Sequence, residues 1–119
     1  MRRRRREAGN YASLLNELKR FKEAKALLRK TMLVARRVLG DENYTTLRVR
    51  WTYAEAIWMD ADATLDDVRE AITTLDGTVR IARRVLGGDH PTVSTMEGDL
   101  EGARAALRFR EKYEVELSI

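Results

Sequence analysis

Apolar residues recur at steps of three and four positions along most of the chain, which is the pattern of helices that bury one face. No alternation with a period of two is long enough to indicate a strand. The pattern predicts five helices in an all-α protein, over residues 8–20, 21–39, 43–59, 64–86 and 91–112. Residues 113–119 continue the last helix for a turn or form a loose tail.

The apolar stripe of each helix gives its expected core. The residues expected to face inward are Tyr11, Leu14, Leu15 and Leu18; Ala24, Leu27, Leu28, Thr31, Met32, Ala35 and Leu39; Val49, Tyr53 and Ile57; Val68, Ala71, Leu75, Val79, Ala82 and Leu86; and Val93, Met96, Leu100, Ala103 and Leu107. The opposite side of the last helix carries Arg104, Arg108, Arg110 and Glu111, which are expected to face water.

Polar residues, a proline and a glycine stand where these helices are expected to begin or end. Asn43 and Thr64 are predicted N-caps, because their side-chain oxygens can accept a hydrogen bond from the first turn of the helix. His90 is the counterpart of Asn43 in the second half of the chain and precedes Pro91, and proline suits the first position of a helix. Gly40 is expected to end the second helix in a left-handed turn.

The chain contains an internal repeat. Residues 35–40 and 82–87 share the sequence Ala-Arg-Arg-Val-Leu-Gly, 47 positions apart, whereas Tyr11-Ala12 matches Tyr53-Ala54 at an offset of 42. The second unit therefore carries five extra residues, which are expected in an enlarged turn at residues 60–66. A repeat of this length indicates stacked supersecondary units. We predict a right-handed α-solenoid of two antiparallel helical hairpins and a C-terminal capping helix.

This repeat divides the chain into three predicted parts. They are a basic arm at residues 1–7, a repeat domain at residues 8–112 with units at about 8–42, 43–89 and 90–112, and a tail at residues 113–119.

The positive charge is concentrated at one end. The formal net charge is +4, of which Arg2–Arg6 supply +5, so the remaining residues sum to −1. A secretory signal would need an apolar stretch after such a run, but Glu7-Ala8-Gly9-Asn10 follows it. The arm could bind nucleic acid or anionic membrane, although it lacks interleaved aromatic residues. The alternatives are a solvated tail and a nuclear or organelle address, and we expect a cytoplasmic, intracellular protein.

Candidate catalytic and metal-binding residues are few. The chain has no cysteine and one histidine, His90. A catalytic histidine needs a nucleophile or an orienting carboxylate around it, so a capping role before Pro91 is the simpler interpretation. The segment Asp60-Ala61-Asp62 begins like a calcium loop, but Leu65 and Ala71 stand where that loop requires glycine and glutamate. We therefore expect no enzyme activity, no metal site and no cofactor.

The hairpins resemble tetratricopeptide repeats. The closely packed alanine of that family corresponds here to Ala12, Ala24, Ala54 and Ala71. Residues 38–41 (Val-Leu-Gly-Asp) and 85–91 (Val-Leu-Gly-Gly-Asp-His-Pro) are similar to the junctions of the kinesin light chain branch, whose repeats exceed the usual length of about 34 residues. This resemblance implies a non-catalytic protein that holds a peptide or protein segment on a concave surface lined by the first helix of each hairpin.

Carried over position by position, the resemblance gives a set of partner-binding candidates that lie off the apolar stripe of their helices. They are Ser13, Asn16, Glu17 and Arg20 in the first unit, and Arg48, Trp51, Glu55, Trp58 and Met59 in the second. Trp58 or Met59 is the expected apolar anchor, because aromatic residues dominate interface hot spots. Alternatively, Trp58 packs over the five-residue insertion and Trp51 is buried.

Three functions remain open from the sequence. The leading hypothesis is an interaction module, a scaffold or adaptor that captures a partner segment. The second is a structural subunit of a larger assembly, and the third is a nucleic-acid or anionic-membrane binder that acts through Arg2–Arg6.

The N-terminal hairpin also carries apolar residues beyond one stripe, namely Tyr11, Leu14, Leu15 and Leu18, with Leu27, Leu33 and Val34 in the next helix. A contiguous exposed apolar patch marks an interface, so we expect this end to pack against another chain, either a second copy or a different protein. The alternative is that Leu14 and Leu33 cover each other and that arginine stems shield the rest.

Overall fold

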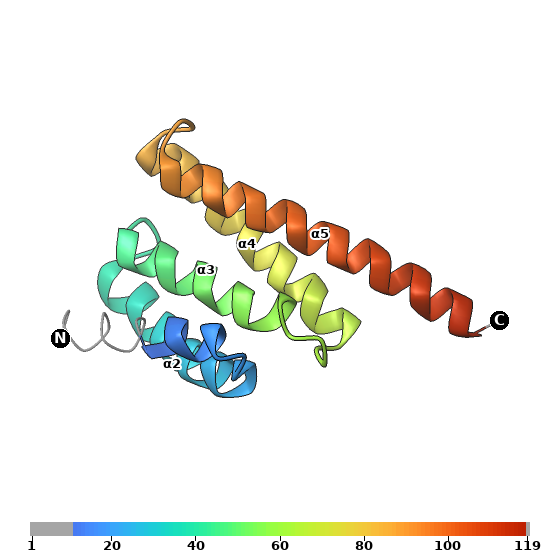
Figure 1. Ribbon diagram of the computed structural model, residues 1–119. Helices are drawn as coiled ribbons and strands as arrows, with labels where there is room; N and C mark the ends of the chain where they lie inside the picture. The colour runs from blue at the N-terminus through green and yellow to red at the C-terminus, as the bar shows by residue number, and fades with distance from the viewer. Residues whose placement is uncertain (1–10, 119) are drawn as a thin grey trace.

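The computed structural model describes the backbone of residues 11–118 and the side chains of residues 11–115. This part of the chain folds into helices only: a first helix whose described part is residues 11–17, then α2 (Phe21–Leu39), α3 (Tyr44–Trp58), α4 (Leu65–Leu86) and α5 (Pro91–Ser118). The first helix and α2 form one hairpin and α3 and α4 a second, with α5 after them (Figure 1). The predicted all-α arrangement of two helical hairpins and a C-terminal helix is confirmed.

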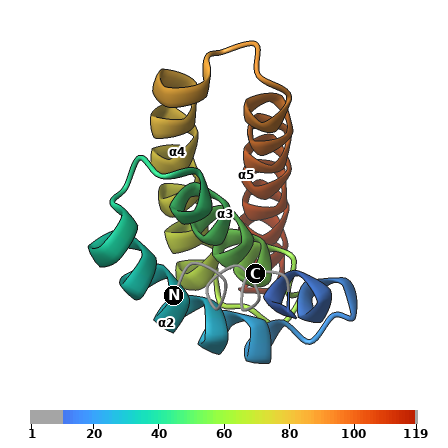
Figure 2. The same ribbon diagram turned by 90° about the vertical axis from the view of Figure 1, so that its left-hand side faces the viewer.

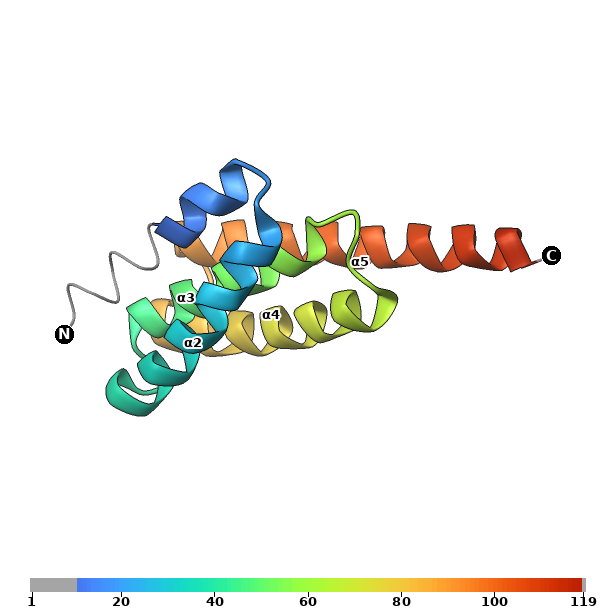
Figure 3. The ribbon, with the colours of Figure 1, turned by 90° about the horizontal axis from the view of Figure 1, so that it is seen from below.

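The helices stack in chain order. α2 packs on α3, α3 on α4 and α4 on α5, and α3 also contacts α5 directly. α4 and α5 run side by side in Figure 2. In Figure 3, α2 and α4 lie along the lower side, and the first helix and α5 lie along the upper side. α3 is hydrogen-bonded to both of the latter, through Thr52 to Asn16 of the first helix and through Trp51 to Asp99 of α5. We call the first helix, α3 and α5 together the first-helix layer.

The apolar stripes of α2 to α5 point inward as predicted. Ala24, Leu28 and Ala35 of α2 are fully buried, and the stripes of α3, α4 and α5 supply most of the remaining core. Tyr53 of α3 ties three helices together, because its hydroxyl accepts a hydrogen bond from Arg29 of α2 (3.2 Å) and donates one to Glu70 of α4 (3.2 Å). None of the described helices is long and apolar enough to cross a membrane.

The first helix corrects one prediction. Its buried residues are Ala12, Leu15 and Asn16, whereas Tyr11 is 53% exposed. Leu14 and Leu18, also expected in the core, are exposed as well. Ala12, Leu15 and Asn16 follow one another at steps of three and one and form the buried stripe, whereas Tyr11, Leu14 and Leu18 form the adjacent stripe, which points outward.

The cap predictions hold. Asn43 accepts a hydrogen bond from the backbone N–H of Thr45 (2.9 Å), and Nδ1 of His90 accepts the equivalent bond from Thr92 (3.1 Å). Thr64 forms a capping box with Asp67 at the start of α4. Gly40 ends α2 with a positive φ of 85° but a ψ of 164°, so the turn is not the expected left-handed helical one. This backbone region is open essentially to glycine alone.

The five-residue insertion is divided between a loop and a helix. The loop from α3 to α4 covers residues 59–64, whereas only residues 18–20 separate the first helix from α2. α4 has 22 residues and α2 has 19, so α4 gains most of one turn at its start. The enlarged turn therefore ends at Thr64, and not at Asp66 as the sequence predicted.

α5 continues beyond residue 112 through Ser118. Of the two alternatives for the end of the chain, the structure therefore shows the continued helix, by more than the single turn that was expected, and not the tail. Three ion pairs join α5 to the antiparallel α4: Glu97 with Arg83 (3.5 Å), Arg104 with Asp76 (3.4 Å) and Glu111 with Arg69 (3.5 Å). The three residues of α5 are seven positions apart, and so are their three partners on α4, which corresponds to two helical turns. Arg104 and Glu111 were expected to face water alone, and they lie instead along this contact.

Candidate partner-binding surface

The first-helix layer is held together by side chains that were predicted to bind a partner. Nδ2 of Asn16 donates a hydrogen bond to the carbonyl of Thr52 on α3 (3.2 Å). Nε1 of Trp51 on α3 donates one to Asp99 on α5 (2.6 Å). Asn16 is 8% exposed and Trp51 is half-buried. These two residues position neighbouring helices, and Asn16 has little surface left for a partner.

Five of the nine candidates form an accessible surface, which we call the first-helix face. They are Ser13 and Glu17 of the first helix, Arg48 and Glu55 of α3, and Met59, which directly follows α3. Glu17, Arg48 and Met59 are exposed, and Ser13 and Glu55 are half-buried. The 42-residue offset of the repeat aligns Ser13 with Glu55 and Glu17 with Met59, so both units contribute the same positions.

Trp58 occupies the position that Asn16 holds in the first unit, and it also contacts the next helix of the layer. A β-carbon at Gly102 of α5 would lie 3.3 Å from Cη2 of Trp58, so the absence of a side chain there gives the indole room. Trp58 therefore packs on α5. Its Nε1 and the Oδ1 of Asn16 are both buried without a hydrogen-bond partner among the described residues.

The layer contains an apolar pair that the sequence analysis missed. Phe109 and Tyr113 of α5 stack with ring centroids 6.4 Å apart, and they are 72% and 54% exposed. They follow Gly102 by seven and eleven residues, so all three share one side of α5. This helical spacing was the signal in the sequence that could have identified the pair. The pair extends the surface at Trp58 and Met59 along α5.

Glu55 and Asp99 bring two carboxyl groups together between α3 and α5. Burial raises the pKa of Glu55 to about 7, and the neighbouring Asp99 carboxyl adds to the effect through its charge and a side-chain hydrogen bond. Burial acts in this direction because it disfavours the charged form of an acid. Sequence reasoning placed Glu55 on this surface but missed Asp99, which faces it from another helix.

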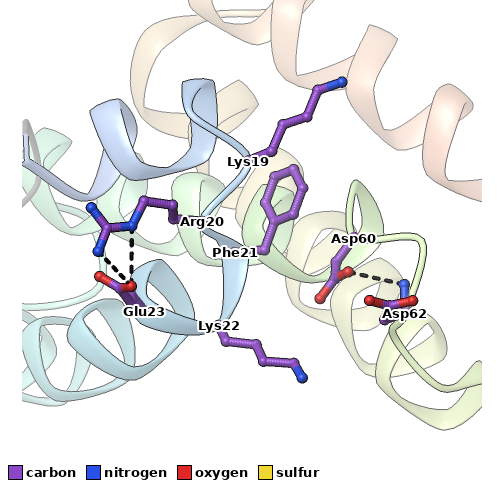
Figure 4. Close-up of a pocket in the computed structure, with 7 residues that line it drawn as sticks. All are labelled: Lys19, Arg20, Phe21, Lys22, Glu23, Asp60 and Asp62. Atoms are coloured by element: carbon purple, nitrogen blue, oxygen red, sulfur yellow. Dashed lines mark hydrogen bonds and ion pairs between the residues drawn. The ribbon is translucent and has the colours of Figure 1, made fainter.

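Arg20 lies apart from the first-helix face. It pairs with Glu23 (2.7 Å) at the start of α2, and both line a pocket with Lys19, Phe21, Lys22, Asp60 and Asp62 (Figure 4). The pocket brings together the turn at residues 18–20 and the loop at residues 59–64, which confirms that the two connections share one edge of the stack. Lys19 has a positive φ of 60°, unusual for a residue other than glycine.

The insertion loop is fixed by an arginine. The guanidinium of Arg110 on α5 donates hydrogen bonds to the backbone carbonyls of Asp60 (2.8 Å), Ala61 (2.7 Å) and Ala63. Arg110 was expected to face water, but it turns to the loop, because the loop carbonyls lack partners within a helix and one guanidinium can donate to several of them. A guanidinium therefore lies against this loop, and its positive charge disfavours a second cation there.

Among the side chains of residues 11–115, no three His, Asp or Glu residues gather as a metal site would require. Arg2–Arg6 and the remainder of the predicted basic arm lie outside the described residues.

Comparison with known proteins gives one result. The family described as Tetratricopeptide repeat matches residues 8–43, which span the first unit. Neither a curated protein nor a solved structure matches the chain. Tetratricopeptide repeats generally mediate protein–protein interaction, and residues 8–43 are similar to them.

Proposed function

We propose that the protein is a non-catalytic interaction module that captures a partner segment on the first-helix face. The observation that supports this most directly is the division of labour within the layer. Asn16, Trp51 and Trp58 connect neighbouring helices, whereas Glu17, Arg48 and Met59 stay exposed beside them. A surface on rigidly connected helices can bind a segment without first being ordered, which reduces the cost of association.

In this proposal Met59 is the apolar anchor. It is 50% exposed and follows Trp58 in the chain. Asp60, the next residue, is bonded to Arg110, which is adjacent to the exposed Phe109. Arg48, Glu17 and Glu55 would supply polar contacts around this anchor. Such a centre with a polar rim is the usual arrangement of an interface. The kinesin light chain type of repeat is part of the proposal, on the strength of the two junction sequences.

Selection of a random peptide library on the intact chain tests this function. Peptides that bind should lose at least tenfold affinity for Met59→Asp by isothermal titration calorimetry. Val38→Asp is the matched control, because Val38 of α2 is 48% exposed and lies outside the first-helix layer. Equal affinity of both variants, or loss in Val38→Asp alone, would contradict the proposal.

A structural subunit is the second candidate, and one observation favours it. The repeat aligns Tyr11 and Leu14 with Tyr53 and Ala56, which are 2% and 1% exposed where the first unit covers them. Tyr11 and Leu14 are 53% and 48% exposed. Leu18 is also exposed. Leu33 is 59% exposed as well, so Leu14 and Leu33 do not cover each other as the alternative suggested. We propose that another chain covers this end.

Analytical ultracentrifugation tests the self-association form of this candidate. A concentration-dependent dimer in the micromolar range should revert to monomer in Leu14→Glu. The exposed Val85→Glu on α4 should leave it unchanged. A monomer at all concentrations would leave a different protein as the partner and would exclude a second copy.

A further inference from the structure

Two acidic side chains from neighbouring helices face each other at the contact of α3 with α5. Nε1 of Trp51 holds the Asp99 carboxylate on this side of α5 at 2.6 Å. Glu55 is four residues after Trp51, on the same side of α3, and lies within side-chain hydrogen-bonding reach of Asp99. Both carboxyl groups are half-buried.

No cation in the described part of the chain balances this pair. Neither Glu55 nor Asp99 is within ion-pair distance of a lysine or arginine there, although Glu97 and Glu111 of α5 each have an arginine of α4. Arg48 is on α3 together with Glu55, but it stands seven residues away, which is about 10 Å along the helix axis.

The other elements around the pair add no charge to it. The first helix contributes the neutral Asn16 at Thr52, and the exposed Glu17 does not act on Glu55. The charged residues of α4 that reach α5 are Arg69, Asp76 and Arg83. They form ion pairs with α5 along the α4–α5 contact, and not with Glu55 or Asp99. Asp99 is the charged group that acts on Glu55.

We propose that Glu55 and Asp99 share one proton at the contact of α3 with α5, and that loss of this proton loosens the contact and makes the first-helix face pH-sensitive. With one proton, the protonated carboxyl donates a hydrogen bond to the other. Without it, two like charges stand together in a half-buried place, where repulsion is stronger than in water. The effect on binding rests on the proposed function, whereas the change in the contact does not.

The range of pH follows from the carboxyl pair. Because the pKa of Glu55 is raised to about 7, the proton is bound below neutrality and lost above it. Because the Asp99 carboxyl acts on Glu55 through its charge and a side-chain hydrogen bond, the transition depends on both residues. The helices move apart on the side where Trp51 and Trp58 touch α5, and this exposes the indole rings to water.

The two tryptophans of the chain both lie at this contact, so intrinsic fluorescence reports on it directly. Wild-type protein titrated from pH 5.5 to 8.5 should show a red shift of tryptophan emission with a midpoint near 7, while far-ultraviolet circular dichroism stays constant. Glu55→Gln and Asp99→Asn should abolish the transition. Glu17→Gln, which changes an exposed carboxylate of the same face, should keep it.

Histidine is the side chain that ordinarily changes charge between pH 5 and 8, so the single His90 needs its own control. His90→Asn places at the start of α5 the cap that Asn43 supplies to α3, and it should leave the transition intact. Loss of the transition in His90→Asn and its persistence in Glu55→Gln would overturn the inference. If Glu55→Gln does not fold, the carboxyl carbon of Glu55 in wild-type protein, followed by nuclear magnetic resonance, should titrate near pH 7; an ordinary acidic midpoint would overturn the inference equally.

Binding separates the two proposals. A peptide selected on the intact chain should change its affinity between pH 6 and 8 for wild type by at least threefold, and by less than that for Glu55→Gln. Fluorescence that titrates in a chain that binds no peptide would contradict the proposed function alone. Binding through Met59 together with a flat fluorescence titration would contradict the shared proton alone.

Discussion

α5 meets two helices in opposite ways. Along α4 it places Glu97, Arg104 and Glu111 against partners of opposite charge, each two turns from the next. Along α3 it places Asp99 against Glu55, another acid. Each exposed pair on the α4 side contributes only about 0.2–1 kcal/mol. Their alternating order matters more, because a slip of seven residues would set like charges side by side.

The difference separates a contact that defines the fold from one that faces a surface. The α4–α5 contact has matched charges and a continuous apolar core beneath them. Within the part of the chain that the structure describes, the α3–α5 contact has a carboxyl pair without a balancing cation and an indole, that of Trp58, whose Nε1 has no hydrogen-bond partner. Groups that reduce stability are common at functional sites, where they are retained for binding or switching. The contrast supports the first-helix face as the working surface of the molecule.

Overpacking the helix crossings should have the largest effect, because the core beneath both contacts depends on it. Ala24 of α2 and Ala71 of α4 are fully buried at equivalent positions of the repeat. Replacement of either by leucine should reduce the free energy of unfolding by about 1–3 kcal/mol. Ala26→Leu on the exposed side of α2 is the control and should change the melting temperature little. Unchanged melting of the Ala24 and Ala71 variants would show that the two alanines do not stand at close crossings.

The sequence patterns predicted features within one helix well and contacts between helices poorly. Helical spacing and capping chemistry are local, so they correctly gave the helices, the caps at Asn43 and Thr64 and the equivalence of His90. They could not show which side chain of one helix meets which of another. Asn16, Trp51 and Arg110 lie off the apolar stripe of their own helices, and all three are nevertheless engaged by a neighbouring helix or loop.

One interhelical feature was present in the sequence. Glu97, Arg104 and Glu111 alternate in charge every seven residues, and Arg83, Asp76 and Arg69 do so in the opposite direction. Comparison of these two series would have given the antiparallel register of α4 and α5. No comparable signal marks Asp99, because a single acid opposite Glu55 has no periodicity.

The carboxyl pair predicts how stability depends on pH. The pKa of Glu55 is about 7 in the folded protein and close to its ordinary acidic value when unfolded, so the folded state binds the extra proton. Stability should therefore fall as pH rises from about 4.5 to about 7. We expect roughly 1–2 kcal/mol for this half-exposed site after solvent screening. Urea unfolding at pH 5 and pH 8 should show this loss in wild type and a smaller loss in Glu55→Gln; equal losses would contradict it.

The third contact of α5 is the one that Arg110 makes with the loop of residues 59–64. Arg110→Met keeps the apolar stem and removes the hydrogen bonds to the carbonyls of Asp60, Ala61 and Ala63. Because these carbonyls are near water, we expect a stability loss of only about 1 kcal/mol, with faster amide exchange confined to the loop and the end of α3. Arg108→Met is the exposed control. Calorimetry should detect no tight calcium binding in wild type, and a stoichiometric calcium site would contradict this interpretation of the loop.

The smallest expected effect is the coupling energy between two charged residues. It is also the sharpest test of the comparison, because the sign of the coupling should differ between the two contacts. Arg83 and Glu97 form the ion pair of the α4–α5 contact in which neither residue has a second ion-pair partner among the described residues. A double-mutant cycle with Arg83→Ala and Glu97→Ala at pH 8 should give a favourable coupling of about 0.2–1 kcal/mol, and 1 M salt should reduce it. The corresponding cycle with Glu55→Gln and Asp99→Asn at pH 8 should give the opposite sign, because removal of either charge relieves the other. At pH 5.5, where the pair holds its proton, the second coupling should become favourable while the first stays nearly unchanged. Couplings of the same sign at pH 8 would mean that the two contacts of α5 do not differ in the way their charges indicate.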